Sequence, residues 1–362
     1  MKGISTMATT HRLQASHLHS ITRRIFVAAG ATRHIADDVA EILVNANLAG
    51  HDSHGVLRIP AYLRSIEGGG IVPNVEPEVA RETANTMFFD GKNCFGHYIA
   101  RQAMDRAIEK AKAADICSVS IVNTGHIGRL GEYAEAAADA GCIGIITTGG
   151  GGRMQGITVP FGGAGGATGT NPIAVGVPTG DDAPFVIDIA TSMIAEGKIQ
   201  VARSKGEDLP EDHIVDKDGN PSIKPADFYD GGFLLPFGLH KGYSFGLLVC
   251  LLGGLSGTFD IEKGSMGGCF MQVINVSGLT PVEEYQQGVR AFLDGIKSIP
   301  PAPGFNEVLV PGDFEHRNRV QRLADGIELP DTIHQQISEC AETLGVSMGE
   351  DAVEPADAER YE

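Results

Sequence analysis

Two short runs of the sequence combine histidine with glycine and arginine in a pattern that suits proton transfer beside an anion. The first is residues 50–58 (GHDSHGVLR), and the second is residues 125–129 (GHIGR). Histidine titrates closest to neutral pH, so His54 and His126 are candidates for moving a proton. Arg58 lies one helical turn after His54 and offers a planar fork for a carboxylate. Together the two runs predict chemistry on a small acid.

The first run must be positioned by the helical segments on either side of it. Residues 12–49 predict a helix, because apolar side chains such as Ile35, Val39 and Ile42 recur at helical spacing. This helix should stop near Gly50, which places His54 in a loop or at the start of the next helix. If that helix begins at His54, Arg58 and Tyr62 share its face.

The second run follows a strand. The pattern predicts a helix over 96–114, a strand over 118–122, a helix over 130–140 and a strand over 143–148. His126 comes directly after the first of these strands. In open α/β sheets, ligands bind outside the carboxyl ends of the strands, which favours a functional position for His126.

The remaining segments are read in the same way. Glycine clusters over 149–152 and 162–169 predict loops with close backbone approaches, and Thr191-Ser192 is a candidate N-cap for a helix over 193–204. His240 opens an apolar helix that ends near 252. Further predicted elements are strands over 173–177, 185–189 and 271–276, a proline-rich connector over 301–311 and a closing helix over 331–345.

Each motif also has a simpler structural interpretation. His51 and His54 lack a third ligand at metal-site spacing, so no metal site is expected. The run around His54 could be a polar turn, a lone histidine after a strand is more often structural, and the segment after Asp188 could simply cap a helix. Neither G-x-G-x-x-G nor the P-loop pattern occurs in a nucleotide-binding context, which disfavours a standard Rossmann domain.

Bulk composition limits the function classes. The chain has 362 residues, enough for two or three substructures, and a net charge of −18, which disfavours nucleic acid and anionic membranes as partners. Six scattered cysteines without a C-x-x-C pair predict a reducing compartment, and no signal or membrane-spanning pattern is evident, so we expect a cytoplasmic protein. The acidic tail over 350–362 is expected to be solvated, and Met1 and Met7 are alternative starts.

Six blocks in this order resemble the type-2 malate/L-lactate dehydrogenase family, which is distinct from the Rossmann-type enzymes. The family includes ureidoglycolate, sulfolactate and hydroxycarboxylate dehydrogenases and a cyclic-imine reductase. The blocks cover nearly the whole chain and are residues 46–58, 123–131, 159–178 (VPFGGAGGATGTNPIAVGVP), 188–198 (DIATSMIAEGK), 235–247 (LPFGLHKGYSFGL) and 303–313 (PGFNEVLVPGD).

The resemblance implies an α/β, non-Rossmann fold that binds NAD or NADP, and a homodimer. In that fold a central mixed-sheet nucleotide domain is inserted into a helical domain built from both termini. The implied parts are an N-terminal helical and substrate part over 1–115, a nucleotide-binding domain over 116–300 and a C-terminal segment over 301–362 that returns to the helical domain.

The resemblance also implies roles for individual residues. His126 would be the general acid–base, assisted by His54, and Ser53, His54, Arg58 and Tyr62 would line the substrate site, with Arg58 holding the carboxylate. The implied cofactor contacts are Gly128, Arg129, Leu130, Val186, Ile187, Asp188, Ile189, Ala190, Thr191, Ser192, His240, Asn275, Gly312, Asp313, Phe314 and Glu315.

Two departures from the family pattern put the substrate and a cofactor contact in question. The loop predicted over 149–156 is unusually glycine-rich, so a substrate-binding side chain found there in relatives would be lost. Asp313 stands where the family often has glutamate, which shortens a possible ribose contact.

The sequence leaves the substrate open among malate, lactate and related hydroxycarboxylates. Alternatives are an NADPH-dependent reductase of a cyclic imine carboxylate, a ureidoglycolate dehydrogenase, and a binding protein that has lost turnover. The choice between NAD and NADP also stays open.

Overall fold

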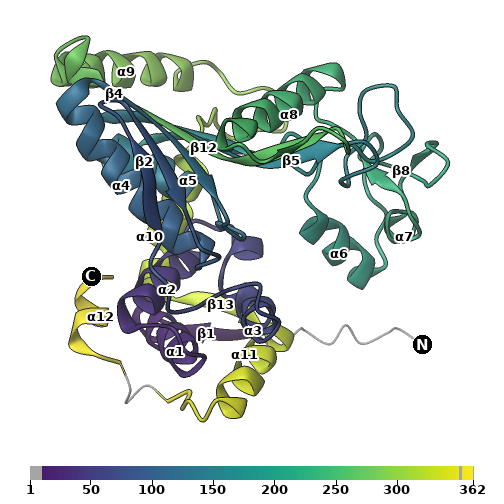
Figure 1. Cartoon of the computed structure of the whole chain (residues 1–362), viewed down its shortest axis with the longest axis horizontal. Helices are drawn as coiled ribbons and strands as arrows, with labels where there is room; N and C mark the ends of the chain where they lie inside the picture. Colours follow the sequence, from purple (N-terminus) through teal and green to yellow (C-terminus); the bar gives the residue numbers. More distant parts are fainter. Residues whose placement is uncertain (1–9, 350–352, 362) are drawn as a thin grey trace.

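The computed structural model describes residues 10–349 and 353–361, so the candidate starts Met1 and Met7 lie outside the described residues, as does Glu350. A large sheet with helices on both faces lies above a layer of helices in which the two ends of the chain meet (Figure 1). No helix within these two ranges is both long and apolar enough to span a membrane.

The central sheet is mixed. Its strands run in the order β2-β3-β4-β12-β5-β6-β7, and β11 pairs with β12 outside that order. β3 and β4 are parallel, whereas the other pairs in the sheet are antiparallel. The predicted α/β class with a central mixed sheet is confirmed. The strands are β2 (Glu78–Glu82), β3 (Thr86–Asp90), β4 (Ile116–Val122), β5 (Cys142–Gly152), β6 (Ile173–Val177), β7 (Phe185–Ile189), β11 (Phe259–Asp260) and β12 (Ser265–Asn275).

Helices cover both faces of this sheet. α4 (Gly96–Ala114) and α5 (Gly131–Asp139) lie on the side of the helical layer, while α8 (His240–Gly253) and α9 (Val282–Lys297) lie on the opposite side (Figure 1). α4 buries one stripe of small and apolar side chains, among them Ile99, Ala103, Met104 and Ala107, against the sheet. Its predicted bounds are confirmed.

The helical layer is built from both ends of the chain. β1 (Thr10–Leu13) pairs antiparallel with β13 (Ile327–Pro330), which fastens the first described residues to the C-terminal segment. The layer shares its core with the sheet through buried side chains such as Ile21, Phe26 and Phe95. Its helices are α1 (Ala15–Ala28), α2 (Arg33–Leu48), α3 (Ile59–Glu67), α10 (Asp313–Asp325), α11 (Asp331–Thr343) and α12 (Pro355–Glu359).

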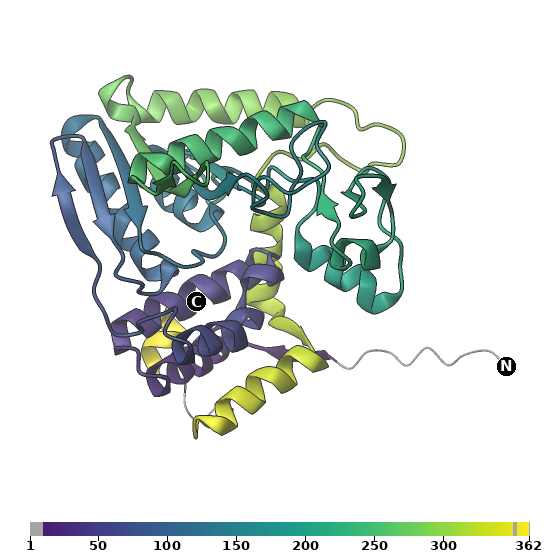
Figure 2. The same ribbon diagram turned by 45° about the vertical axis from the view of Figure 1, so that its right-hand side comes forward.

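A small lobe stands at one end of the sheet, on the side of the helical layer (Figure 2). It has its own core of Ile199, Leu209, Ile214, Phe228 and Leu234. Its elements are α6 (Glu196–Lys205), β8 (Ile214–Val215), β9 (Pro221–Ser222), α7 (Pro225–Tyr229) and β10 (Phe233–Leu234). Within the described ranges there are also four short 3-10 helices, namely η1 (Asp52–His54), η2 (Val56–Arg58), η3 (Gly254–Ser256) and η4 (Val276–Gly278).

The structure corrects two predictions near the site. Residues 12–49 are not one helix, because α1 ends at Ala28 and Gly30 adopts φ 98° in the turn before α2. Residues 149–152 are not a loop, because they end β5 and pair with the first residues of β12. A Cβ on Gly150 would lie 3.2 Å from the carbonyl oxygen of Met266. These glycines therefore let two strands and their neighbours pack closely.

A third correction concerns the segment after β7. The helix predicted over 193–204 begins three residues later, at Glu196, with Ala195 as its N-cap. The hydroxyl of Ser192 donates to the carbonyl of Ile194 and does not cap the helix. Helices α9 and α10 were not predicted. The domain boundary at 115 stays a prediction, although the sheet takes β2 and β3 from before it.

The expectation of a solvated tail holds only in part for residues 353–361, where some side chains are exposed and others pack on the helical layer. α12 packs on α1, and Asp357 is 2% exposed. Arg23, itself 3% exposed, donates from Nη2 to Asp357 at 2.9 Å. Asp357 also completes a capping box with Glu354. A buried, hydrogen-bonded ion pair thus fastens the tail to the helical layer.

We expect Asp357→Ala to lower the free energy of unfolding by about 3 kcal/mol, because it leaves the Arg23 guanidinium buried with fewer partners. Urea unfolding measures this. Asp208→Ala is the matched control: Asp208 pairs with Lys224 at 2.7 Å on the surface, so its loss should cost less than about 1 kcal/mol. Equal losses in the two variants would contradict a structural role for the tail.

Candidate active site

The turn that carries Ser53 and His54 is fixed by the last turn of α2. The Asn47 side chain accepts the N–H of Val56 through Oδ1 at 2.9 Å. A Cβ on Gly55 would lie 2.1 Å from this same oxygen, so only glycine fits beside it. The sequence therefore folds back on itself directly after α2 and presents the two polar side chains between α2 and α3.

The C-terminal segment holds the same turn from outside. Arg322 of α10 donates two hydrogen bonds to the Asp52 carboxylate, at 2.6 and 3.0 Å. Asn47 donates to that carboxylate as well, at 2.6 Å. From the small lobe, Gly197 in the first turn of α6 approaches Ser53, since a Cβ there would lie 3.6 Å from the Cβ of Ser53.

His126 lies in the loop between β4 and α5, as its position after a strand predicted. Tyr133 donates to the carbonyl of Ile127 at 2.5 Å, and the first residue of α4, Gly96, packs against the carbonyl of His126. The rings of His126 and His54 are stacked, with centroids 5.6 Å apart and planes at 14°. The structure thus brings the two predicted histidines face to face.

Behind His126 lies a buried hydrogen-bonded chain. The Tyr62 hydroxyl is 2.7 Å from Nδ1 of His126 and 3.3 Å from Nε2 of His97. The backbone N–H of Gly128 also donates to Nδ1 of His126, at 3.3 Å. His97 and Tyr62 are both buried. These contacts fix the imidazole of His126 through Nδ1 and leave Nε2 for other partners.

Both histidines are neutral at pH 7. Burial, and then the charge of Arg58, lowers the pKa of His126 to about 4. Burial, followed by the charges of His126 and Arg58, lowers the pKa of His54 to about 3. Burial also raises the pKa of Tyr62 above its usual value, so its hydroxyl keeps its proton.

Arg58 is anchored at one nitrogen only. Its Nε donates to the carbonyl of Ser53 at 2.7 Å, whereas Nη1 and Nη2 make no hydrogen bond to any described residue. The Ser53 hydroxyl lies 3.0 Å from Nδ1 of His54. A guanidinium held by Nε with its other edge open is suited to bind a carboxylate through two parallel hydrogen bonds.

A second polar group joins the end of β7 to the start of α5. Asp188 accepts the N–H of Gly131 at 2.7 Å and lies 3.6 Å from Nε of Arg129. The Arg129 side chain is 1% exposed and donates from Nη2 to Glu135 at 2.5 Å, yet its Nε and Nη1 have no hydrogen-bond partner among the described residues. Burial raises the pKa of Asp188.

The turn before α10 approaches the edge strand β7. Gly312 has φ 102°, and a Cβ there would lie 2.5 Å from the carbonyl oxygen of Pro184. The N–H of Val186 donates to the carbonyl of Pro311 at 3.3 Å. Only glycine allows this approach, so the predicted residues at 186 and 312 are brought together.

The acidic residues at the start of α10 already have partners. Asp313 accepts the N–H of Val310 at 3.0 Å and pairs with Lys297 at 2.7 Å. Glu315 lies 3.0 Å from Nε2 of His51. As it stands, the carboxylate of Asp313 stabilises its own turn.

One predicted cofactor residue, Asn275, lies away from these groups. It ends β12, six residues beyond Cys269, which pairs with the end of β4, so about 20 Å of strand separates Asn275 from that end of the sheet. Its Oδ1 accepts the N–H of Ser277. His240 begins α8, whose first turn packs against Thr191, since a Cβ on Gly242 would lie 2.8 Å from the carbonyl oxygen of Thr191. The His240 ring lies 5.9 Å from that of Phe161.

The other predicted cofactor residues lie in the core, on β7 or on the surface of α10. Thr191 is buried and donates to the carbonyl of Thr170 at 3.0 Å, and Leu130 belongs to the main core. Phe314 is exposed on α10. Ile187 and Ile189 lie on the edge strand β7, followed by Ala190.

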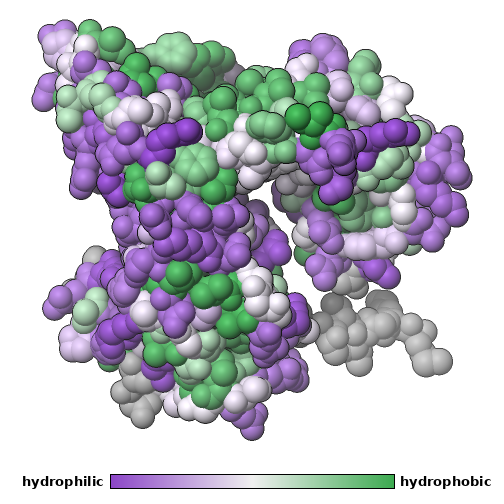
Figure 3. Space-filling model, in the orientation of Figure 1, coloured by the Kyte–Doolittle hydropathy of each residue, from purple (hydrophilic) through white to green (hydrophobic). Residues whose placement is uncertain are grey.

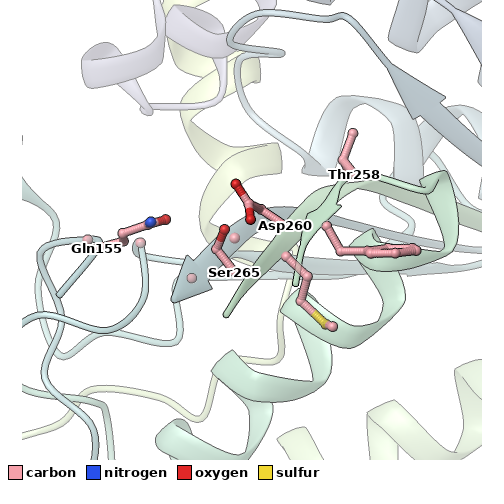
Figure 4. Close-up of a pocket in the computed structure, with 10 residues that line it drawn as sticks. Gln155, Thr258, Asp260 and Ser265 are labelled. Atoms are coloured by element: carbon pink, nitrogen blue, oxygen red, sulfur yellow. The ribbon is translucent and has the colours of Figure 1, made fainter. Parts of the chain in front are cut away.

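An open depression of about 590 Å³ lies where β5 ends and β12 begins, beside β11. Figure 4 shows polar side chains of Gln155, Thr258, Asp260 and Ser265 around it. Its floor includes Gly150 and neighbouring glycines, so it borders the glycine-rich segment singled out in the sequence. None of the predicted site residues lines it.

Sequence reasoning missed three residues that build the site. His97 contacts Tyr62 from α4 and Arg322 contacts Asp52 from α10, both from distant parts of the sequence. Asn47 contacts Val56 from the end of α2, nine residues away. His97 lies among the core residues of a helical pattern, and a polar residue at such a position is the one signal that could have found it.

Comparison with known proteins identifies the family of this chain. Residues 13–338 match the family model described as malate/L-lactate dehydrogenase. Malate dehydrogenase of Pyrococcus horikoshii is 34% identical over 350 residues, covering 92% of this chain and 96% of that protein. Further relatives bear the names hydroxycarboxylate, sulfolactate and L-lactate dehydrogenase.

Solved structures share the fold over almost the whole chain. The crystal structure of malate dehydrogenase from Entamoeba histolytica matches with a TM-score of 0.88 and 27% identity, covering 94% of this chain and 99% of that one. Delta1-piperideine-2-carboxylate reductase from Pseudomonas syringae matches with a TM-score of 0.79 and 32% identity, covering 91% and 100%. The chain therefore belongs to the malate/L-lactate dehydrogenase family and is an oxidoreductase that interconverts a 2-hydroxy acid and its 2-oxo acid, which implies a nicotinamide cofactor.

Proposed function

We propose that His126 moves the hydroxyl proton of the acid while Arg58 holds its carboxylate. The observation that carries this is the anchoring of both side chains from behind. His126 is held at Nδ1 and Arg58 at Nε, so Nε2 of the one and the two Nη groups of the other stay available. In reduction, the oxygen on C2 gains a proton from Nε2 of His126, and in oxidation the same nitrogen takes it back.

The other predicted substrate residues have supporting roles in this proposal. His54 stacks on His126 and excludes water from one face of its ring. Ser53 lies beside His54 and supplies the carbonyl that orients Arg58. Tyr62 acts through its hydrogen bond to His126. The reacting carbon is thereby placed by fixed groups, which lowers the entropic cost of the reaction.

The cofactor, NAD or NADP, is proposed to lie along the start of α5 and the end of β7. The open donors of the buried Arg129 and the Oδ1 of Asp188, which accepts no hydrogen bond among the described residues, fit its phosphate and its hydroxyl or amide groups. The backbone from Gly128 to Leu130 lines the same place. When bound, the nicotinamide supplies or accepts the hydride.

A homodimer is proposed from the outer face of α8. Gly246, Val249 and Cys250 face the sheet, whereas Phe245, Leu248 and Leu251 are exposed. Figure 3 shows apolar side chains gathered over this helix. A helix that is apolar all round is normally covered on all sides. Sedimentation velocity should therefore show a dimer for the natural chain and a monomer for Leu251→Glu; a monomeric natural chain would exclude this interface.

The six free cysteines also support the reducing cytoplasm as the proposed compartment.

The experiment that tests the function is the oxidation of NADH and of NADPH against a panel of 2-oxo acids, with cyclic imine carboxylates in the same plate. Turnover of a 2-oxo acid is expected, and the preferred nucleotide identifies the cofactor. Turnover of imines alone would mean that the substrate is a cyclic imine carboxylate and not a 2-oxo acid. If neither class of compound reacts but the nucleotide still binds, a binding protein is favoured.

The pKa of His126 predicts opposite pH dependences for the two directions. Because this pKa is lowered to about 4, reduction must take up a proton at neutral pH, so kcat/KM for the 2-oxo acid should fall about tenfold per pH unit between about pH 6 and 8. Oxidation needs the neutral imidazole, so its kcat/KM should stay level over that range. Initial rates in both directions test this, and parallel profiles would contradict it.

A further inference from the structure

The proposed reaction does not use His97, although this residue is fully buried beneath the site. Its Nε2 lies 3.3 Å from the Tyr62 hydroxyl, and its Nδ1 has no hydrogen-bond partner among the described residues. Gly128 packs directly on its ring: a Cβ there would lie 2.8 Å from Nε2 of His97, and Gly128 has φ 76°. The chain has thus kept an incompletely satisfied imidazole in a position where a hydrophobic side chain could fill the space.

Hydrogen positions in the chain His97–Tyr62–His126 have two consistent arrangements. In the first, Nε2–H of His97 donates to Tyr62, and Tyr62 donates to Nδ1 of His126, which then carries its proton on Nε2. In the second, every bond is reversed, so His126 carries its proton on Nδ1 and His97 carries one on its own Nδ1. The tautomers of the two histidines are therefore linked through one hydroxyl.

Two contacts outside the chain favour the first arrangement. The N–H of Gly128 points its hydrogen at Nδ1 of His126, 3.3 Å away, and needs that nitrogen as an acceptor. The second arrangement would also bury an N–H at Nδ1 of His97 without any partner, whereas the first leaves only an unfilled acceptor there. Buried donors without partners are the rarer and more costly case.

We propose that His97 is a positioning residue that directs the Tyr62 hydroxyl hydrogen onto Nδ1 of His126 and thereby keeps the proton of the resting, neutral His126 ring on Nε2. The inference rests on the proposed role of His126, but it concerns hydrogen positions that exist without substrate.

A consequence follows for the ionisation of His126. An imidazolium at His126 carries a proton on Nδ1 and needs Tyr62 as an acceptor there. The neutral ring that takes the hydroxyl proton at Nε2 in oxidation also carries its own proton on Nδ1. The hydrogen-bonded chain must therefore reverse before His126 can be protonated at Nε2. His97 therefore opposes protonation of His126 beyond the effect of burial. The groups that face His126 are His54 on η1, Arg58 on η2, Tyr62 on α3 and His97 on α4, and of these only Tyr62 joins His97 to it by hydrogen bonds.

The test is the tautomer of His126, read from the 15N shifts of its ring in histidine-labelled protein without ligand at pH 7.5. The signal is assigned by its loss in His126→Asn. We expect the proton on Nε2 in the natural chain. In His97→Leu the share of the Nδ1–H tautomer should rise about tenfold, the effect expected for one hydrogen bond. His97→Gln, which keeps a side-chain N–H beneath Tyr62, should restore the natural state.

Tyr62→Phe separates positioning from packing. If His97 acts through the hydroxyl, His97→Leu should change nothing further in the Tyr62→Phe background. The acid limb of kcat/KM for hydroxy acid oxidation should also rise by about one pH unit in His97→Leu alone.

A His126 proton on Nδ1 in the natural chain would overturn the proposal, whether or not His97→Leu folds. Equal effects of His97→Leu with and without the Tyr62 hydroxyl would also overturn it. If no 2-oxo acid is turned over but His126 shows the expected tautomer, the proposed function is rejected and this inference still holds.

Discussion

Replacing His126 with asparagine should lower kcat for 2-oxo acid reduction by about 10²- to 10⁴-fold, the usual contribution of general acid–base catalysis. Asparagine occupies a similar volume and can accept the N–H of Gly128, so the loop after β4 should keep its shape. It cannot carry a proton between solvent and substrate. Steady-state rates with the best acid of the panel measure this loss.

Cofactor affinity serves as the internal control for that variant, because Arg129 and Asp188 do not depend on the imidazole. The Kd for NADH or NADPH, measured by fluorescence titration, should change less than about threefold. His213→Asn is a matched control, since His213 is half-buried in the small lobe and, among the described residues, its ring hydrogen-bonds only to the carbonyl of Glu211. Normal turnover in His126→Asn would remove His126 from the mechanism.

Local periodicity predicted the elements that carry this chemistry. The bounds of α4, β6 and β7 agree with the structure to the residue, because glycine, proline or aspartate stands at or next to each of their ends. His126 was placed correctly after β4 for the same reason. A short-range pattern suffices where burial on one face of a single element decides the structure.

Contacts between distant segments could not be predicted from such patterns. The extended glycine run at the end of β5 has loop composition, yet β12 pairs with it because two glycine-rich strands can approach closely. The acidic tail has a solvated composition, yet Asp357 meets an arginine from α1. The proposed role of His97 likewise depends on its contact with Tyr62, which lies on another helix. In each case tertiary packing decides which distant residue the segment contacts.

Some site residues could be predicted from the local sequence and others could not. Histidine and arginine in glycine-rich turns were enough to predict proton transfer on a small acid, whereas the cofactor contacts were implied only by the family resemblance. Their side chains are spread from the start of α5 to the far end of β12, with Asn275 outside the cluster around Asp188. No single spacing rule connects them, because an extended cofactor is contacted by many separate turns.

Replacing Arg58 with lysine should raise KM for the 2-oxo acid by about 10- to 100-fold while kcat falls less. Lysine keeps the positive charge but cannot donate two parallel hydrogen bonds to a carboxylate, and the loss of one charge-assisted hydrogen bond accounts for a change of this size. It also lacks Nε, so the hydrogen bond to the carbonyl of Ser53 disappears and the charged end loses its orientation.

Arg64→Lys is the matched control, because Arg64 is exposed at the end of α3, the helix that follows Arg58. This control should leave KM unchanged. Methyl esters of the same acids provide a second comparison, since they lack the carboxylate that Arg58 is proposed to bind: the natural enzyme should discriminate strongly between acid and ester, and Arg58→Lys should discriminate about 10- to 100-fold less. An unchanged KM in Arg58→Lys would mean that another cation binds the carboxylate, and the open Nη groups of Arg58 would then have no role in substrate recognition.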